Sequence, residues 1–284
     1  MLLKVENLSV AFRMEDKTSV PVRDVGFSVE KGGRVALVGE SGCGKSLTAL
    51  ALGGLVERAE ISGRITGSPR ISYIFQNPMQ SLNPVMRVGR QIEEASPRRN
   101  MSKIAVADAL EAVGLPRDSA RGFPCQFSGG QQQRVMIAMA LAAEPDLLIA
   151  DEPTTALDVT TQKEVLDLIE RKAAQRGSAV LFITHNLGLV KLYSSFVNVM
   201  YAGRIVESGP VAKVLGAPKH PYTRGLIAAV PDITAEKDAP LRDIPGTVPP
   251  PWDWPKGCAF HPRCPYAKPA CSSDSFDVCP FTAD

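Results

Sequence analysis

The chain has 284 residues, 44% hydrophobic and 22% charged, which is enough for one large domain with an appended segment. Its 32 Lys and Arg residues nearly balance its 30 Asp and Glu residues, and a net charge of +2 argues against nucleic acid as the main partner. No basic stretch followed by an apolar core opens the sequence, and Glu144, Pro145 and Asp146 interrupt the longest apolar run, residues 135–150. We therefore expect a cytosolic chain that reaches a membrane only through a partner.

The first 55 residues are predicted to contain strands, a phosphate-binding turn and a helix. Residues 1 to about 30 read as short strands around a polar turn at 14–19, and the apolar run 35–38 as a buried strand. A helix is expected over 47–55. Between this strand and this helix lies a complete G-x-x-x-x-G-K-S sequence. A glycine-rich turn that only joins a strand to a helix is the alternative, and the Lys-Ser pair argues against it.

The G-x-x-x-x-G-K-S sequence predicts a nucleotide site, because its glycines let backbone N–H groups surround phosphate oxygens at a helix N-terminus. Lys45 is expected to reach the β- and γ-phosphates, and the Ser46 hydroxyl to ligate Mg²⁺. Cys43 is interpreted as a small spacer, although a helix N-terminus can make a thiol reactive. The predicted phosphate loop consists of Gly39, Glu40, Ser41, Gly42, Cys43, Gly44, Lys45 and Ser46.

Strand character disappears between residues 77 and 127, where prolines recur and residues 102–113 show helical apolar spacing. A second glycine-rich run follows at 127–131. We expect this run to open a helix over about 131–143, whose N-terminal N–H groups can also bind phosphate.

A buried strand over 147–150 is predicted to end in two adjacent carboxylates, Asp151 and Glu152. Because successive strand residues point to opposite sides, the two carboxylates can have different roles. Asp151 is expected to hold Mg²⁺, and Glu152 to orient or deprotonate an attacking water.

The remaining core elements are an amphipathic helix over 158–175 and strands near 179–184, 196–200 and 204–207. His185 follows the first of these strands, where its side chain can reach a γ-phosphate; a structural histidine at a strand end is an equally good interpretation. The order of elements predicts the fold class, a three-layer α/β core with a mainly parallel sheet.

The C-terminal segment differs in composition, because ten of the 23 prolines lie after residue 239. Residues 257–266 are expected to form neither a core strand nor a helix. Four of the six cysteines lie here, and reducing conditions in the cytosol disfavour disulfides. Four thiolates suit zinc or an iron–sulfur cluster, solvated thiols are the alternative, and His261 is a competing ligand. The cysteines are Cys258, Cys264, Cys271 and Cys279.

From about residue 2 to residue 209 the ordered motifs resemble those of an ATP-binding-cassette (ABC) ATPase. Residues 39–46 match its Walker A loop and 147–152 its Walker B strand. Single residues also match: Gln76 the Q-loop glutamine, His185 the switch histidine and Phe12 the aromatic residue that stacks on adenine. The signature is matched by Phe127 in place of Leu, then Ser128, Gly129, Gly130 and Gln131. The D-loop is matched by Thr155 in place of Ser, then Ala156, Leu157 and Asp158.

This resemblance implies a P-loop nucleotide-binding domain with a RecA-like core, an antiparallel β subdomain and a helical subdomain. It implies that ATP and Mg²⁺ are bound, with Ser46, Gln76 and Asp151 around the metal, and that Glu152, His185 and Gln76 are catalytic. In this family the signature residues bind the nucleotide of the opposite subunit, so the working unit is a dimer.

A narrower resemblance covers nearly the whole chain. Residues 77–84, 219–226, 245–249 and 257–266 resemble the ATPases of dipeptide and oligopeptide ABC importers. The resemblance implies an ATPase domain over 1–215, with a helical subdomain at about 78–140, and an extension over 216–284. It also implies a [4Fe–4S] cluster on the four C-terminal cysteines, with zinc as the alternative.

The importer resemblance implies partners as well. We expect a second, homologous ATPase subunit in a heterodimer, two transmembrane permeases, an extracytoplasmic solute-binding protein and no nucleic acid. The expected location is the cytoplasmic face of the bacterial plasma membrane. The alternative function is that of a nickel or metal-chelate importer. Two further alternatives are a soluble ATPase that remodels DNA or ribosomes and a redox-sensing ATPase. ATP binding is expected to survive loss of any one C-terminal cysteine.

Overall fold

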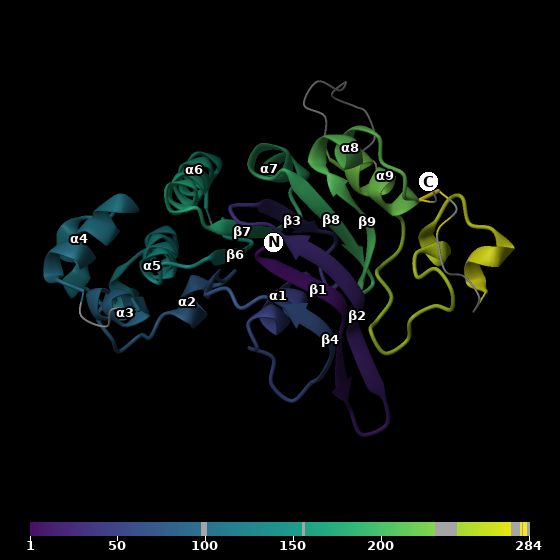
Figure 1. The fold of residues 1–284 in the computed structure, drawn as a ribbon, viewed down its shortest axis with the longest axis horizontal. Helices are drawn as coiled ribbons and strands as arrows, with labels where there is room; N and C mark the ends of the chain where they lie inside the picture. The colour runs from purple at the N-terminus through teal and green to yellow at the C-terminus, as the bar shows by residue number, and fades with distance from the viewer. Residues whose placement is uncertain (98–100, 155–156, 231–242, 274–278, 280, 283–284) are drawn as a thin grey trace.

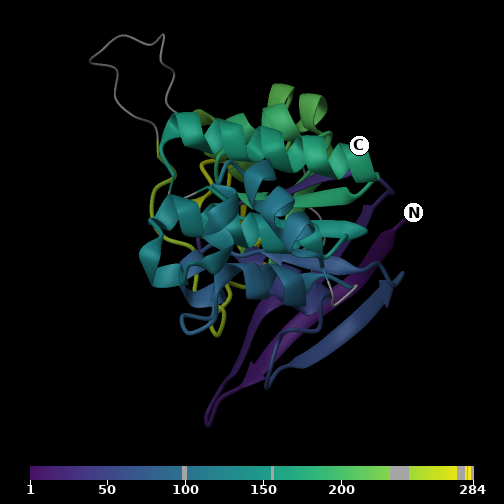
Figure 2. The ribbon, with the colours of Figure 1, turned by 90° about the vertical axis from the view of Figure 1, so that its left-hand side faces the viewer.

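The computed structural model describes residues 1–97, 101–154, 157–230, 243–273, 279 and 281–282, without the side chains of 159 and 160. Figure 1 shows helices α2–α5 at one end, the sheets in the middle and the C-terminal segment at the other end. Figure 2, turned by 90°, looks onto the helical end.

The larger sheet has six strands in the order β5-β6-β7-β3-β8-β9, and only the pairing of β8 with β9 is antiparallel. The strands β3, β6, β7 and β8 are buried almost throughout, as expected for a sheet covered on both faces, whereas the edge strands β5 and β9 are partly exposed. The mainly parallel α/β core is therefore confirmed. The strands are β3 (Arg34–Val38), β5 (Ile71–Ile74), β6 (Leu147–Asp151), β7 (Ala179–Thr184), β8 (Phe196–Tyr201) and β9 (Arg204–Pro210).

The smaller sheet is antiparallel, with the order β2-β1-β4. It consists of β1 (Leu3–Arg13), β2 (Thr18–Val29) and β4 (Glu60–Thr66). The prediction of short strands was wrong, since β1 has 11 residues and β2 has 12. Residues such as Leu3, Val5 and Val10 alternate toward a core that β1 and β2 share with β3 and α1, and this shared burial sustains the full length.

Helices cover both faces of the larger sheet. α1 (Lys45–Leu52) shares a core cluster with Val35 and Leu37 of β3, whereas Ala36 and Val38 point into a cluster with α7 (Leu187–Tyr193) and α8 (Val211–Gly216). Alternate residues of one buried strand thus contact different helix layers. This arrangement is the predicted three-layer core.

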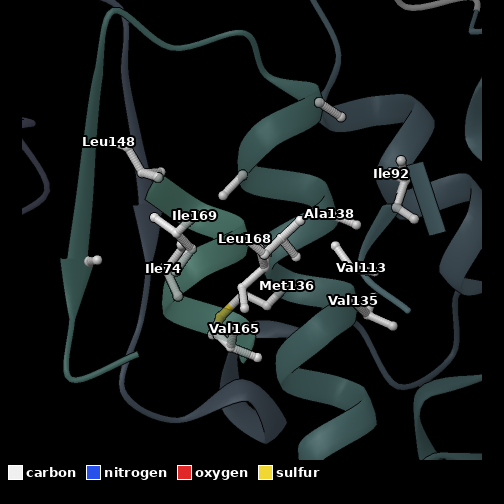
Figure 3. Packing of buried hydrophobic residues seen from close by; sticks show 14 of the residues in the cluster. Ile74, Ile92, Val113, Val135, Met136, Ala138, Leu148, Val165, Leu168 and Ile169 are labelled. Carbon is white, nitrogen blue, oxygen red and sulfur yellow. The ribbon is translucent and has the colours of Figure 1, made fainter. Parts of the chain in front are cut away.

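Residues 78–142 form helices and turns, with no strand among those that the structure describes. A single hydrophobic cluster joins this helical region to β5, β6 and α6 (Val159–Arg176), as Figure 3 shows for Ile92, Met136, Leu148 and Ile169. The helices over 102–113 and from about 131 are confirmed. The elements are α2 (Pro78–Ser81), α3 (Val88–Ala95), α4 (Lys103–Ala112), η1 (Arg117–Arg121), η2 (Pro124–Gln126) and α5 (Gly129–Ala142).

The described residues of the C-terminal segment pack on the core, where Tyr222 and Phe260 join the hydrophobic cluster that includes Val38 and Val199. It contains α9 (Pro221–Ala228), η3 (His261–Arg263) and η4 (Pro269–Ser272), and the cysteine-rich run is irregular apart from these short 3₁₀ turns, as predicted. Trp254 Nε1 donates to the Val20 carbonyl of β2 at 3.0 Å. Among the described residues, no helix has both the length and the apolar character needed to cross a membrane.

Candidate functional site

The sheet order places four candidate loops at one edge. β5, β6, β7 and β3 are successive parallel neighbours, so their carboxyl ends lie together. Gln76 follows β5, Glu152 follows β6, His185 follows β7 and the loop 39–44 follows β3. Ligand sites in open α/β sheets lie outside the carboxyl ends of the strands. This edge is the candidate functional site.

Two glycines of the loop 39–44 are required by close approach and by backbone conformation. Gly39 has φ 152° and Gly44 has φ 101°, values that L side chains rarely adopt. A Cβ on Gly39 would collide with the Met200 carbonyl, and one on Gly44 with the carbonyl of Pro21. The loop is thus wedged between β8 and β2, and only glycine fits at both positions.

Lys45 lies within the loop, not in solvent. Its ammonium donates to the carbonyls of Gly39 at 2.8 Å and Glu40 at 2.9 Å, and the residue is only 6% exposed. A buried cation held by neutral carbonyls can turn toward an incoming phosphate. The Cys43 thiol is completely buried and burial raises its pKa, in agreement with its interpretation as a spacer.

Asp151 and Ser46 lie next to each other, as a magnesium site requires. Burial raises the pKa of Asp151, while a hydrogen bond from Ser46 lowers it. Asp151 Oδ1 is buried and has no hydrogen-bond partner. Mg²⁺ prefers a carboxylate and a hydroxyl oxygen beside substrate phosphates, so this donor set fits the metal. Asp151 Oδ1, which has no hydrogen-bond partner, is the atom that would bind Mg²⁺.

Gln76, Glu152 and His185 converge on a single carboxylate. Gln76 Nε2 donates to Glu152 Oε2 at 3.0 Å, and His185 Nδ1 lies 2.9 Å from Glu152 Oε1. The Glu152 side chain is 15% exposed and that of His185 is 63% exposed. His185 therefore has a polar partner at the site, which would not be expected of a histidine with only a structural role at a strand end.

Glu152 and Asp151 face different partners, as expected. Glu152 lies just beyond β6 and has φ 45°, a left-handed conformation that is uncommon for a residue other than glycine. Its N–H donates to the carbonyl of Ile183 in β7 at 2.9 Å, which fixes the turn. Asp151 thus lies beside Ser46, while Glu152 meets Gln76 and His185, so the two carboxylates have different surroundings.

The glycine-rich run 127–131 begins helix α5. The Ser128 hydroxyl accepts from the Gln131 N–H at 3.4 Å, and Gln131 Oε1 accepts from the Ser128 N–H at 2.9 Å, which is a capping box. This cap explains why the helix begins at Gly129, two residues earlier than predicted. In Figure 1 α5 lies among α2–α4, away from α1 and the phosphate loop. The two glycine-rich motifs of one chain are therefore separate.

The remaining predicted contacts have less structural support. Asp158 caps α6 by accepting from the Thr161 N–H at 3.0 Å, whereas Thr155 and Ala156 lie outside the described residues. Phe12 is half-buried near the end of β1 and packs against the core of the smaller sheet. Adenine stacking by Phe12 and nucleotide contacts of Asp158 stay predictions.

Two residues of the C-terminal segment reach the phosphate loop, and the sequence analysis assigned no role to either. Arg263 donates to the Glu40 carboxylate through Nη1 at 2.8 Å and Nη2 at 2.9 Å. The Glu40 N–H donates to the hydroxyl of Tyr222 at 2.8 Å. Both residues lie inside conspicuous motifs, at 219–226 and 257–266, but a separation of 223 residues from Glu40 leaves no local signal for the contact.

The four C-terminal cysteines form no disulfide bond with one another, and Cys271 is buried. Burial raises the pKa of Cys258, and the charges of Cys279, Cys271 and Cys264 act in the same direction, so the four thiols lie within electrostatic reach of one another. Among the described residues, no group of three or more His, Cys, Asp or Glu side chains is arranged to hold a metal ion. The predicted metal site is therefore not shown here.

Comparison with known proteins defines the class. The ABC transporter family model matches residues 22–155, and the model of the oligopeptide/dipeptide transporter C-terminal region matches residues 206–271. The dipeptide transport ATP-binding protein DppD of Escherichia coli is 42% identical over 96% of this chain and 91% of its own length. A Brucella ovis protein named as a peptide import ATP-binding protein is 44% identical over 95% and 91%.

Solved structures agree with the fold. The cassette MJ0796 bound to ADP and Pi superposes with a TM-score of 0.67 at 24% identity, covering 74% of this chain and 99% of MJ0796. CbiO1 of Clostridium perfringens, part of the complex cbiONQ, gives 0.64 at 27% identity, covering 76% and 91%. Fold and site define a P-loop ATPase. More particularly, the chain belongs to the ABC transporter family and is one of its ATP-binding proteins.

Proposed function

We propose that this chain hydrolyses ATP to power import of dipeptides or oligopeptides through membrane permeases. The observation that carries the ATPase part is the convergence of Gln76 and His185 on Glu152, beside Lys45 and Asp151 at one sheet edge. The peptide part is supported by the match of residues 206–271 and by the names of the relatives. These names favour peptides over a nickel chelate.

The side chains divide the reaction between them. Lys45 leaves its two carbonyl partners to pair with the β- and γ-phosphates, and the loop N–H groups surround them. Ser46, Asp151 and Gln76 would hold Mg²⁺, which when bound neutralises phosphate charge. Glu152 orients the attacking water and accepts its proton, Gln76 holds the carboxylate in place, and His185 reaches toward the γ-phosphate.

A dimer completes the site in this proposal. The N–H groups of Gly129 and Gly130 lie at the start of α5, which Ser128 caps, away from the chain's own phosphate loop, so they can face the nucleotide of a second subunit. Gln131 and Asp158 would also contact the nucleotide of the second subunit. We propose a homologous ATPase as the second subunit, with two permeases and an extracytoplasmic solute-binding protein, at the cytoplasmic face of the plasma membrane.

We further propose a functional division at residue 215, with a helical subdomain at about 78–140 and an extension over 216–284. The extension shares a hydrophobic cluster with β3 and β8 through Tyr222 and Phe260. It is therefore a functional appendage that depends on the ATPase core for its own packing.

In the extension we propose a [4Fe–4S] cluster on Cys258, Cys264, Cys271 and Cys279. Backbone N–H groups reach all four sulfurs, among them Lys268 N–H to Cys271 Sγ at 3.4 Å, and such hydrogen bonds stabilise thiolates. A cavity of about 220 Å³ beside Cys258 and Cys279 is lined by Arg23 and Arg204, whose charge suits an anionic cluster.

The transport proposal is tested by reconstituting the full chain with its permeases and second ATPase in vesicles. Peptide uptake should require ATP and stop in the Lys45→Ala variant. Uptake of a nickel chelate without peptide uptake would identify the chelate as the cargo, and ATPase activity that needs DNA or ribosomes would contradict the transport role.

Metal analysis of anaerobically purified protein tests the cluster: about four irons with sulfide are expected. One zinc without sulfide would instead identify a structural zinc site, and no metal would contradict both.

A further inference from the structure

The phosphate loop carries an acidic residue at its second position, and the C-terminal extension neutralises it. Glu40 would place a negative charge beside the phosphates of a bound nucleotide, where like charges repel. Its carboxylate instead receives both terminal nitrogens of Arg263, at 2.8 and 2.9 Å. This is the bidentate geometry in which Arg pairs most strongly with a carboxylate. The negative charge is therefore compensated by a residue far along the chain.

Besides its contacts with Glu40, Arg263 is held by hydrogen bonds within the extension. Its Nε donates to the Pro245 carbonyl at 2.8 Å, and Nη2 donates to the Ile244 carbonyl at 2.9 Å. The guanidinium also lies 5.8 Å from the ring centroid of Tyr201, and the Arg263 side chain is only 5% exposed. Because the guanidinium is held by neighbours within the extension, its position follows the conformation of residues 244–264.

The extension holds the main chain of Glu40 as well. The Glu40 N–H donates to the hydroxyl of Tyr222, which is completely buried. Tyr222 packs against Tyr201 with ring centroids 4.6 Å apart and against Phe260 at 5.4 Å, and Phe260 lies between two of the cysteines in sequence. One loop residue is thus anchored by its side chain and by its backbone, both times from the extension.

We propose that Arg263 and Tyr222 are positioning residues for the phosphate loop, through which the cysteine-rich extension sets the affinity for ATP. Arg263 cancels the charge of Glu40 and Tyr222 holds its backbone, so the loop keeps a form that accepts a triphosphate. The proposal requires ATP binding by the loop, but neither a peptide cargo nor an iron–sulfur cluster.

The test is a titration of the full chain with ATP, measured as a dissociation constant. Arg263→Gln should weaken ATP binding roughly tenfold, within the range over which coupled sites change each other's affinity. The Glu40→Gln variant removes the charge that Arg263 cancels, and its dissociation constant is the reference for the double variant. The double variant should return from the weak affinity of Arg263→Gln to that of Glu40→Gln. Additive weakening in the double variant would overturn the charge argument.

Arg224→Gln is the matched control, since Arg224 also lies in the extension and donates to a backbone carbonyl, that of Pro218, without reaching the loop. It should bind ATP like wild type; weakening equal to that of Arg263→Gln would reduce the effect to general loosening and overturn the proposal. Tyr222→Phe removes a single hydroxyl and covers the case in which Arg263→Gln does not fold. It should weaken binding about fivefold, as the loss of one hydrogen bond would, and a wild-type value there would contradict the proposal.

A kinetic measurement separates this role from catalysis. In the assembled transporter Arg263→Gln should raise the KM for ATP and leave kcat at saturating ATP nearly unchanged, because the contacts of Glu152 are not altered. A fall in kcat at constant KM would contradict a positioning role. Lys45→Ala, measured alongside, should lose ATP binding in either case, so a failure of the ATP site itself remains distinguishable.

Discussion

Replacement of Glu152 by glutamine should nearly abolish turnover while ATP still binds. The amide is the same size as the carboxylate and can still accept from Gln76, but it carries no charge and cannot accept the proton of a water. Loss of a positioned base slows a reaction by about 10²–10⁴-fold, which corresponds to roughly 3–5 kcal/mol of activation free energy.

The cost to folding should be much smaller. The Glu152 carboxylate lies 3.0 Å from Gln76 Nε2 and 2.9 Å from His185 Nδ1, and a net hydrogen bond is worth about 1 kcal/mol. The variant should therefore stay folded, and because Lys45 is held by the carbonyls of Gly39 and Glu40, its ground-state affinity for ATP should be kept. ATP-bound dimers should accumulate.

Single-turnover hydrolysis and equilibrium ATP binding, measured on the same preparation, check this prediction. Glu170→Gln is the matched control, because Glu170 is also a paired carboxylate, 2.6 Å from Arg34 Nε at the opposite end of β3 from the phosphate loop. It should turn over ATP normally. Glu152→Gln turnover within a fewfold of wild type would remove Glu152 from its role, and loss of ATP binding would show that the variant damages the site as a whole.

Three further variants test neighbouring parts of the site. Lys45→Ala should weaken ATP binding and activity together, since it removes a cation from both bound substrate and transition state, and equilibrium titration decides this. Asp151→Asn should lose Mg²⁺-dependent turnover yet melt at a higher temperature without nucleotide at pH 7. Burial raises the pKa of Asp151, so its ionised form costs stability above that pKa, and the gain should shrink as the pH falls through it. Cys271→Ser should lower iron content and speed proteolysis after about residue 254 with the core helices still protected; an unchanged iron content would exclude Cys271 as a ligand.

Local patterns predicted the parts of the site that lie within one strand–loop–helix unit. The phosphate loop follows β3 and the carboxylates follow β6, because apolar runs and glycines specify these units over a few residues. The order of strands in the sheet is not a local property. It is this order, β5-β6-β7, that brings Gln76 and His185 to Glu152 from 76 and 33 residues away. Only the resemblance to a family predicted that the three residues belong together.

The contact between the extension and the phosphate loop had no basis in the sequence at all. Arg263 lies among prolines and cysteines whose spacing draws attention to metal chemistry, and Glu40 occupies a variable position of a nucleotide motif. Their pairing depends on how an irregular segment packs against β8 and α9, which hydrophobic periodicity does not describe. Long-range polar contacts of this kind require the structure.

Asp151 and Glu152 have different surroundings, as the sequence predicted, but alternation along a strand is only part of the reason. Alternation along a strand would turn the two side chains to opposite faces, but β6 ends at Asp151, and Glu152 already has the left-handed φ of 45°. Such a conformation costs on the order of 1–3 kcal/mol in a residue with a side chain and persists only where its surroundings hold it. Here the N–H of Glu152 is held by β7, and its carboxylate by Gln76 and His185. Glycine would relieve the strain at this position but supply no carboxylate, so the strain is the cost of keeping a carboxylate at the end of the strand.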